Sequence, residues 1–420
     1  MDQKTIGPLI NKYFTKFGYR PISIKQQVEP DLNMVVVIPA YNEPDLLKTL
    51  QSIEECEQPE KPFEVIVVFN HSDNATSTIK DQNIKYYNEA IKFIKNENLK
   101  FKYYIIEAFD LPEKIAGVGL ARKIGMDEAA FRLNENTNGL IICLDADCTV
   151  ASNYLVAIEQ HFNDHENSPG ASVYFEHPLK YSDSNLALGI VQYELHLRYY
   201  NQLIKYTGHP FAFHTVGSSM VVRSWAYQKQ GGMNKRKAGE DFYFLQKIML
   251  LDHFSEIKTT CVYPSPRISD RVPFGTGKAQ GDWVDQQKEQ YLTYHPDVAL
   301  VLRSLFEMVT EKGSKLVSTP ISELPEEIIA FIGSKAWEVK MKELDRNTTN
   351  DKAFVKRFFT WFNLFMTLRF VHFYRDNYKG NIPIVDAAEW FLEIINQEMG
   401  SLEPKMLLEK YKKIEQGEKG

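Results

Sequence analysis

The chain has 420 residues, of which 44% are hydrophobic and 25% are charged, as in an ordinary globular protein. This length allows one large domain and a smaller one. The formal net charge of −6 argues against broad nucleic-acid binding, so no nucleic-acid partner is expected. The sequence has no N-terminal signal pattern and no run of about 18 apolar residues. We therefore expect a cytoplasmic protein without a transmembrane helix.

From residue 34 onward, apolar runs alternate with segments of helical periodicity. Residues 34–38 form a fully apolar, β-branched run, which predicts a parallel strand buried on both faces. Asn42 is a good N-cap for the helix that follows, and Pro44 falls in its first turn. Helical spacing then continues through Leu46, Leu47, Leu50 and Ile53.

The same alternation predicts three more strands. We expect helices at 78–98 and 117–133, a polar loop at 70–74, and strands at 63–69, at 101–106 and up to Asp145. This β-α-β-α-β-α-β order predicts a parallel sheet with right-handed crossovers. Ligands of such sheets bind beyond the carboxyl ends of the strands, where we find Pro39 to Glu43, Asn70 to Asp73 and Asp145 to Asp147.

Asp145 and Asp147 close the fourth strand with two carboxylates one residue apart. Residues i and i+2 of a strand share a face, so both side chains should project together. Two convergent carboxylates suit a hard divalent cation that bridges substrate phosphates. Two surface aspartates in a turn are the alternative, and the preceding buried-type strand favours the metal site. The flanking Cys143 and Cys148 lack disulfide or zinc spacing and are expected to be reduced packing residues.

Five segments in this order resemble the family 2 glycosyltransferases of the GT-A fold: Val37 to Glu43, Gly119 to Gly125, Leu144 to Asp147, Gly217 to Arg223 and Gly239 to Phe244. The resemblance covers residues 33–280. It implies an α/β fold with a GT-A-type, mostly parallel sheet flanked by helices, followed by a mainly helical C-terminal region. It also implies an enzyme of the hexosyltransferase type that moves a sugar from a nucleotide-sugar to an acceptor hydroxyl, with inversion.

The resemblance further implies which residues face the donor. Asp147 would hold a Mn²⁺ or Mg²⁺ ion that neutralises the donor diphosphate. Asp145 would lie nearer the ribose or the sugar, or reach the metal through water. The first strand end would contact the nucleoside through Pro39, Tyr41 and Glu43.

Two further donor-side residues carry open alternatives. The resemblance implies that Arg122 approaches the base or the phosphates. Without the other motifs, a position on a solvated helix face would be the favoured interpretation of Arg122. Asn70 stands where the family often has an aspartate that reads the base. Its amide carbonyl can accept from a ring N–H but carries no charge. A uridine donor is usual for the family, and a guanosine donor stays open.

Glu240 and Asp241 open a predicted helix with an apolar stripe of Phe242, Leu245 and Met249. Carboxylates are favourable at a helix N-terminus whatever their function, so a capping pair is one interpretation. In the interpretation that motif order favours, Asp241 accepts the proton of the attacking hydroxyl, and Glu240 orients it or binds the acceptor.

Residues 262–281 combine basic side chains with glycines. Glycines let backbone N–H groups approach an anion, and arginine binds phosphate with two donors. We expect a flexible loop in which Arg271 and Lys278 clamp the donor phosphates, with Arg267 nearby; an ordinary surface loop is the alternative. His209 and His214 precede the Gly217 segment, and we expect them to be structural histidines rather than metal ligands.

The last third of the chain lies outside the resemblance. A long helix is expected at 183–206, and from residue 284 the pattern is helical with a break near Pro320 and Pro325. Residues 353–378 are rich in large apolar side chains. Such a broad apolar helix is most often a buried core element or a subunit contact. The alternative is a peripheral contact with the inner membrane face, where a lipid-linked acceptor would lie.

We therefore divide the chain into an N-terminal extension (1–32), a catalytic domain (33–283) and a helical C-terminal region (284–420). Without membrane helices or a Gln-x-x-Arg-Trp motif, a non-processive enzyme that glycosylates a saccharide or lipid-linked acceptor is expected. A sugar-phosphate nucleotidyltransferase is one alternative, but it would need a glycine-rich basic loop after the first strand. A non-catalytic nucleotide-sugar-binding protein is the other, and would have no need of Asp145, Asp147 and Asp241.

Overall fold

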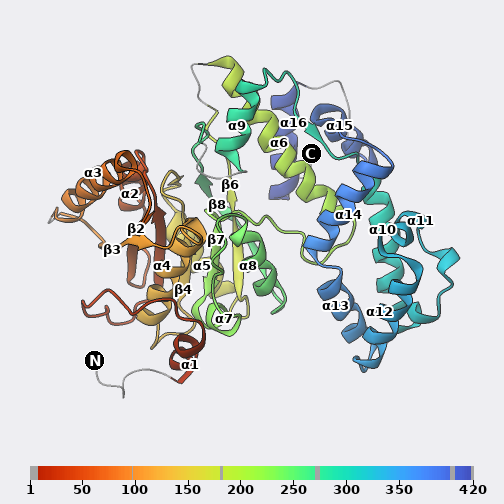
Figure 1. Ribbon diagram of the computed structural model, residues 1–420, viewed down its shortest axis with the longest axis horizontal. Coiled ribbons are helices and arrows are strands. Elements are labelled where there is room, and N and C mark those ends of the chain that lie inside the picture. Colours follow the sequence, from red (N-terminus) through yellow and green to blue (C-terminus); the bar gives the residue numbers. More distant parts are fainter. Residues whose placement is uncertain (1–7, 97, 180–182, 270–274, 398–402, 418–420) are drawn as a thin grey trace. The chain divides into compact units, whose positions relative to one another are not determined.

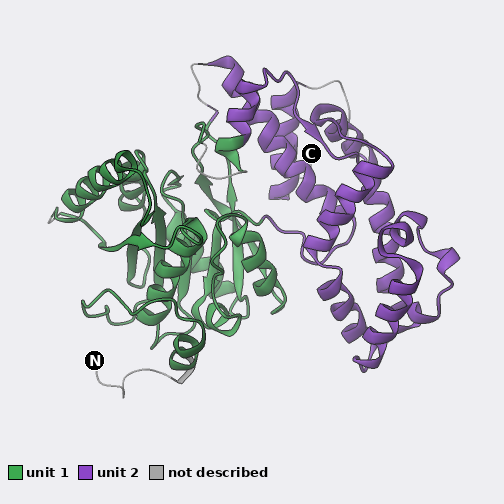
Figure 2. Cartoon of the chain, viewed as in Figure 1, with its two compact units in different colours: residues 1–178, 215–278 green, residues 179–214, 279–420 purple. Residues whose placement is uncertain are grey.

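The computed structural model describes residues 8–96, 98–179, 183–269, 275–397 and 403–417. The chain divides into two compact units (Figures 1 and 2). The first comprises residues 1–178 and 215–278, and the second comprises residues 179–214 and 279–420. The sequence places a boundary after residue 283, and the first unit ends at residue 278. The segment 179–214, which we had placed in the catalytic domain, belongs to the second unit.

The first unit is built on a mixed, mostly parallel sheet, and its described strands have the order β3-β2-β1-β4-β7-β6-β8-β5. Parallel pairing joins β3, β2, β1 and β4 in that order, and also joins β6 to β8. β7 is antiparallel to β4 and β6, and β5 is antiparallel to β8. The strands are β1 (Met34–Ala40), β2 (Phe63–Ser72), β3 (Lys102–Leu111), β4 (Leu140–Cys143), β5 (Thr149–Val150), β6 (Gly170–Phe175), β7 (Met220–Arg223) and β8 (Ser255–Tyr263).

Helices flank this sheet (Figure 1). They are α1 (Pro8–Phe17), α2 (Leu46–Glu54), α3 (Ser77–Ile94), α4 (Val118–Arg132), α5 (Tyr154–Asp164), α7 (Ser224–Lys229) and α8 (Glu240–Met249), with α9 (Thr276–Asp285) starting in this unit. The predicted β-α-β-α-β-α-β order is confirmed, and every residue of β1 is buried.

Two local predictions at the strand ends were wrong. Asn42 does not cap α2, because its backbone has a positive φ of 46° and its N–H donates to Asn83 Oδ1 at 3.1 Å. Asp45 holds the cap position instead. The first three residues of the predicted loop 70–74 belong to β2, which continues to Ser72 by pairing with β3, and only Asp73 and Asn74 form a turn.

α4 is covered on both sides, which explains its many buried charged residues. On one side it packs against β1, β2 and β4, and a Cβ at Gly125 would lie 2.4 Å from Cγ1 of Val37. The N-terminal segment contacts it as well. There the Tyr13 hydroxyl donates to Asp127 Oδ1 at 2.6 Å, and Glu128 accepts backbone N–H bonds from residues 23 and 24.

The second unit is a helical assembly around α6 (Ser184–Tyr206), which packs against α10, α15 and α16. Its other elements are β9 (Leu292–Thr293), α10 (Asp297–Lys312), the 3₁₀ helices η2 (Gly313–Ser318) and η3 (Ile321–Glu323), α11 (Glu326–Ile332), α12 (Ser334–Arg346), α13 (Asp351–Trp361), α14 (Leu364–Asn377), β10 (Ile382–Pro383), α15 (Ile384–Ile394) and α16 (Pro404–Gln416). The break predicted near Pro320 and Pro325 coincides with η2 and η3.

The aromatic segment 353–378 forms two helices rather than one. Asn363 separates them by accepting the N–H of Met366 at 3.0 Å, which caps α14. Phe354, Phe358 and Phe370 are buried in the core of the second unit, so the segment is a core element as expected.

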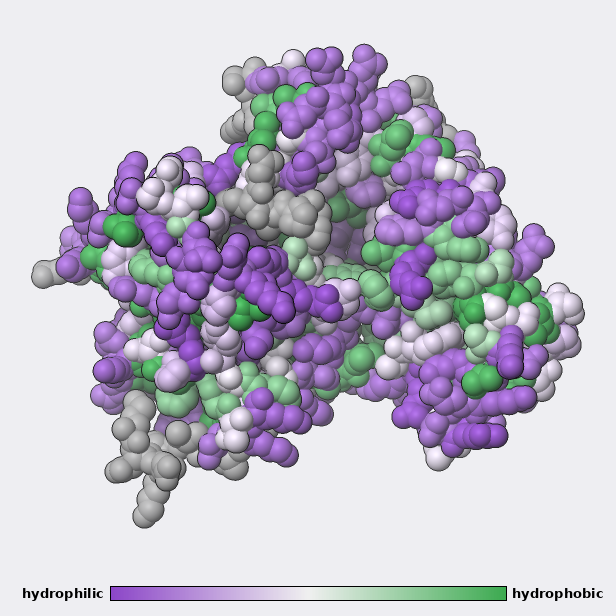
Figure 3. Space-filling model, viewed as in Figure 1, coloured by the Kyte–Doolittle hydropathy of each residue, from purple (hydrophilic) through white to green (hydrophobic). Residues whose placement is uncertain are grey.

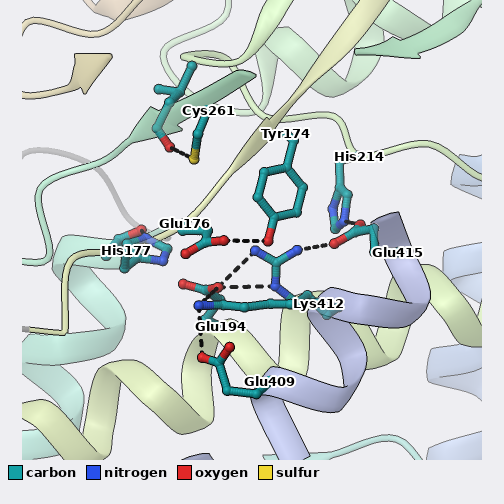
Figure 4. A network of polar contacts seen from close by, with 12 residues as sticks. Tyr174, Glu176, His177, Glu194, His214, Cys261, Glu409, Lys412 and Glu415 are labelled. Atoms are coloured by element: carbon teal, nitrogen blue, oxygen red, sulfur yellow. Dashed lines mark hydrogen bonds and ion pairs between the residues drawn. The ribbon is translucent and has the colours of Figure 1, made fainter. Parts of the chain in front are cut away.

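A buried ion-pair network joins α6 to α16 (Figure 4). The guanidinium of Arg198 bonds Glu194 Oε1 at 2.8 Å and also pairs with Glu415 of α16. His214 pairs with the same Glu415 carboxylate. Burial alone would raise the pKa of Glu415, but His214 and Arg198 outweigh it and lower the pKa to about 2. The last helix is therefore fixed to α6 by charge as well as by packing.

Among the described helices, none combines the length and the apolarity that crossing a bilayer requires. Hydrophilic side chains cover most of the face in Figure 3, and hydrophobic ones form separate small areas. Exposed large apolar side chains of the second unit lie on different helices, as Leu300, Val339, Phe365 and Met406 show. The peripheral membrane contact stays a prediction.

Candidate active site

The carboxyl ends of β1, β2 and β4 meet at one edge of the sheet, and the paired aspartates follow β4 there. The strand ends at Cys143, so a turn, rather than strand alternation, positions both carboxylates. In this turn the N–H of Cys148 donates to the carbonyl of Asp145 at 3.1 Å. Thr49 of α2 also donates to the carbonyl of residue 146 at 2.8 Å. The side chains of Asp145 and Asp147 remain 37% and 24% exposed, so a ligand can reach them.

Arg122 is the centre of the site. Its side chain is only 2% exposed, so the solvated-face alternative was wrong. One guanidinium nitrogen donates to Asp145 Oδ1 at 2.6 Å, and the other pairs with Glu240. Burial alone would lower the pKa of Arg122, but Asp145 and Glu240 outweigh it and raise the pKa. A single cation thus joins the aspartate pair to the start of α8.

Two glycines of the predicted motifs make room for this arrangement. A Cβ at Gly217 would lie 2.8 Å from a guanidinium nitrogen of Arg122. A Cβ at Gly119 would lie 2.2 Å from the carbonyl oxygen of Arg236 and 3.0 Å from Cβ of Glu240. These positions need glycine because charged side chains and backbone approach them closely.

Glu240 and Asp241 begin α8, after Gly239 in the left-handed conformation with φ 68°. The Asp241 carboxylate accepts the N–H of Phe242 at 2.7 Å. Burial raises the pKa of Glu240 to about 7, although Arg122 opposes this. Burial also raises the pKa of Asp241, again against Arg122. Both carboxylates therefore bind a proton at a higher pH than an exposed carboxylate does.

The buried face of α8 differs in part from the predicted apolar stripe. Leu245 and Met249 are buried as expected, but Phe242 is partly exposed. Phe244 and Ile248 are buried in its place, because the helix turns this face toward the sheet.

The end of β1 brings together a group of charges that sequence reasoning did not connect. The Glu43 carboxylate is 1% exposed, accepts the N–H of Asp45 at 3.0 Å and pairs with Arg267. The same guanidinium lies 3.3 Å from Asp45 Oδ2 and 3.9 Å from Asp147 Oδ2. We had placed Arg267 in a basic loop. Glu43 is 224 residues away from Arg267 in the sequence, so no local signal could reveal this pairing.

The other predicted donor-side residues lie at the same strand ends. Asn70 is buried, and its amide nitrogen donates to the carbonyl of Ala40 at 2.9 Å, which ties β2 to β1. Pro39 is a buried residue of β1, and Tyr41 follows that strand and is partly exposed. Their contacts with a nucleoside stay predictions.

The predicted basic loop is shorter than expected. It ends at Gly275, whose φ is 102°, and α9 begins at Thr276. Lys278 is therefore a residue of the first turn of a helix. Arg271 lies outside the described residues, so the proposed clamp is not tested.

His209 and His214 have structural partners in the second unit, as expected. His209 Nε2 lies 3.1 Å from the carbonyl oxygen of Phe362, and burial lowers the pKa of His209 to about 4. His214 pairs with Glu415. Cys143 and Cys148 are free and buried, and burial raises the pKa of both thiols, that of Cys143 to about 12.

Asp145 and Asp147 provide oxygen donors suitable for a hard cation. Within the described part of the chain, no group of three or more His, Cys, Asp or Glu side chains is arranged to hold a metal ion. Mg²⁺ commonly uses one or two carboxylates and completes its coordination with substrate phosphates and water. Arg122 lies 2.6 Å from Asp145 Oδ1, whereas Arg267 lies 3.9 Å from Asp147 Oδ2, so Asp147 is the principal candidate ligand. The donor set fits an ion that binds together with a diphosphate.

Residues 35–227 match the family model described as glycosyl transferase family 2. No curated protein matches the chain. A solved structure of S. aureus TarS 1-349 in complex with UDP-GlcNAc is similar at 12% identity and a TM-score of 0.42, covering 75% of this chain and 90% of that one. TarS 1-349 in complex with UDP is similar at 13% identity and a TM-score of 0.37, covering 79% and 92%. Residues 35–227 therefore form a domain similar to glycosyl transferase family 2, which indicates that the chain is a glycosyltransferase.

Proposed function

We propose that the chain transfers a sugar from a uridine diphosphate sugar to a hydroxyl of a saccharide or lipid-linked acceptor, with inversion and one sugar at a time, in the presence of Mn²⁺ or Mg²⁺. One observation carries this proposal. Buried Arg122 joins Asp145, on the donor side, to Glu240, the neighbour of the base Asp241. Donor and acceptor chemistry would therefore meet at one point of the sheet edge.

On the donor side, Asp147 and Asp145 would hold the metal ion. When bound, the ion neutralises charge on the nucleoside diphosphate, which makes it a better leaving group. The nucleoside would lie against the ends of β1 and β2, near Pro39, Tyr41, Glu43 and Asn70. Arg271 and Lys278 would clamp the diphosphate.

On the acceptor side, Asp241 would take the proton of the hydroxyl as its oxygen attacks the anomeric carbon. The new C–O bond forms on one face of the sugar while the bond to the diphosphate breaks on the other, which inverts the configuration. A base works best when its pKa is near the working pH. The raised pKa of Asp241 suits this role, and the cation of Arg122 limits how far burial raises it.

The test is a transfer assay on the full chain. UDP-GlcNAc and other UDP- and GDP-sugars are incubated with Mn²⁺ and saccharide acceptors, and release of nucleoside diphosphate and the anomeric configuration of the product are followed by NMR. Asp241→Asn should lower kcat by about 10²-fold or more with little change in donor affinity, because shape is kept and the proton acceptor is lost.

Two results would contradict the proposal. Formation of a nucleotide-sugar from a sugar phosphate and a nucleoside triphosphate would make the chain a nucleotidyltransferase. Donor binding with no turnover of any donor–acceptor pair, by wild type and variant alike, would make it a binding protein.

A further inference from the structure

Arg267 places one positive charge against three carboxylates, two of which follow β1 and one of which follows β4. It follows β8 in the chain, and its side chain is 27% exposed. Its guanidinium pairs with Glu43, lies 3.3 Å from Asp45 Oδ2 and lies 3.9 Å from Asp147 Oδ2. Asp147 is the principal candidate metal ligand. The site therefore already contains a cation where the metal would bind.

The contacts of Arg267 differ in strength. Glu43 is almost fully buried, and a buried carboxylate that loses its counter-charge is strongly destabilised. The guanidinium is thus held firmly by Glu43. The guanidinium lies 3.9 Å from Asp147 Oδ2, at the outer limit of an ion pair, so its interaction with Asp147 is easier to break than that with Glu43.

A divalent ion on Asp147 would stand close to the guanidinium that Glu43 retains. Like charges repel, and the repulsion is stronger in a partly dehydrated site than in water. A diphosphate between them would remove this repulsion, because it binds the metal through its oxygens and accepts charge-assisted hydrogen bonds from arginine. The Arg267 side chain is 27% exposed, so a diphosphate can reach part of the guanidinium.

We propose that Arg267 is a built-in counter-ion that makes metal binding conditional on a nucleoside diphosphate, so that metal and donor occupy the site together. The proposal rests on the proposed function, which places metal and donor at Asp147. It predicts positive coupling between the two ligands, and such coupling is reciprocal.

The experiment is calorimetric titration of the full chain with Mn²⁺ alone, with UDP alone, and with each in the presence of the other. Wild type should bind Mn²⁺ weakly without UDP. In Arg267→Gln, Mn²⁺ alone should bind about tenfold more tightly, and the coupling between Mn²⁺ and UDP should fall by about tenfold. A residue that merely supports the fold would weaken both ligands rather than change them in opposite directions.

Two control variants separate charge from packing. Arg375→Gln removes the same charge from α14, where Arg375 pairs with its neighbour Asp376 at 2.7 Å. This variant should bind Mn²⁺ and UDP as wild type does. Arg267→Lys keeps the charge and should keep Mn²⁺ binding weak. Thermal unfolding of each variant confirms that it is folded.

The proposal is overturned if Arg267→Gln binds Mn²⁺ alone no more tightly than wild type, or if its coupling is unchanged. It is also overturned if no variant binds Mn²⁺. A wild type that binds Mn²⁺ but no nucleoside diphosphate or nucleotide-sugar would remove the proposed function instead. The titration with Mn²⁺ alone would then still show whether Arg267 competes with the ion.

Discussion

Arg122 opposes the effect of burial on two carboxylates. Its cation lowers the pKa of Glu240 and that of Asp241, while burial raises both. In Arg122→Gln both pKa values should therefore rise further. The proposed base, Asp241, must be ionised to accept a proton. As the solution is acidified, the rate of the variant should therefore begin to fall at a higher pH than that of wild type. An opposite charge at this range shifts a carboxylate by about 1–3 pH units.

The measurement is the pH dependence of kcat/KM, in which the acidic limb should move upward by about one unit or more. Arg132→Gln is the matched control, because Arg132 is equally buried but pairs with Glu64 away from the site. It should cost stability without moving the limb. An unchanged limb in Arg122→Gln would mean that Arg122 does not act on the base.

Asp147→Ala should abolish the Mn²⁺-dependent part of UDP binding with the fold intact, because it deletes the proposed chief oxygen ligand. The test is calorimetry with and without Mn²⁺. Asp110→Ala removes a carboxylate that is 80% exposed and serves as the control. Equal Mn²⁺ dependence in Asp147→Ala and wild type would place the ion elsewhere.

The sequence indicated several residues that the structure brings together at the candidate site, but it did not indicate which of them pair with one another. Asp145, Asp147, Glu240 and Asp241 carry short local patterns that could be recognised. The pairing of Arg122 with Glu240 spans 118 residues, and its burial depends on elements that pack from elsewhere in the chain. A solvated arginine and a buried one look alike in sequence.

Among the elements, the segment before β7 is sensitive to added volume. A Cβ at Gly217 would lie within 3.0 Å of three guanidinium atoms of Arg122. Gly217→Ala should therefore displace Arg122, lower kcat/KM by about tenfold, and cost about 1–3 kcal/mol of stability, as overpacking does. Gly380→Ala is the control, because nothing lies within 4 Å of its Cβ position. It should change stability by less than about 0.5 kcal/mol.

Steady-state kinetics and chemical denaturation measure these two effects. If Gly217→Ala behaves like Gly380→Ala in both, the loop before β7 adapts and the close approach to Arg122 is not required.

The strands and helices of residues 34–143 could be predicted because apolar runs and helical periodicity are local signals. The extension of β2 to Ser72 could not, because polar residues such as Asn70 join the strand only through pairing with β3. The start of α9 at Thr276 was missed for a similar reason. Glycines at 275 and 277 favour a loop in isolation, and tertiary contacts outweighed that preference.

For the whole molecule, the network between α6 and α16 predicts a pH-dependent stability. The folded pKa of Glu415 is about 2, below its ordinary value of 4.5. A carboxylate whose pKa is lowered by folding stabilises the fold at pH values above its ordinary pKa. This contribution is lost as the pH falls from 4.5 toward 2. Glu415→Gln should lower the free energy of unfolding by about 3 kcal/mol at pH 7, since a buried ion pair is broken.

Urea denaturation of the full chain from pH 7 to pH 3 tests this, and the gap between Glu415→Gln and wild type should narrow below about pH 4.5. Glu409→Gln is the control: Glu409 is 51% exposed, and its pair with Lys412 should contribute less than about 1 kcal/mol. A constant gap across this range would show that the ionisation of Glu415 does not stabilise the second unit.

The division into two units could not be predicted. The sequence placed a boundary close to residue 278, where the composition turns helical, but it gave no reason to separate 179–214 from the sheet. That assignment follows from the packing of α6 against helices from the far end of the chain.

This packing has a consequence for how the protein is made. Arg198 and Glu415 are 217 positions apart, and ribosomes add about 5–20 residues per second. α6 therefore waits roughly 10–40 s for α16 to be synthesised. During that time the β7 and β8 segments emerge and can complete the sheet, while the face of α6 that packs against α16 has no native cover. Nascent chains stalled before residue 404 should have a folded sheet and an exposed apolar face on α6. We expect chaperones to bind these chains.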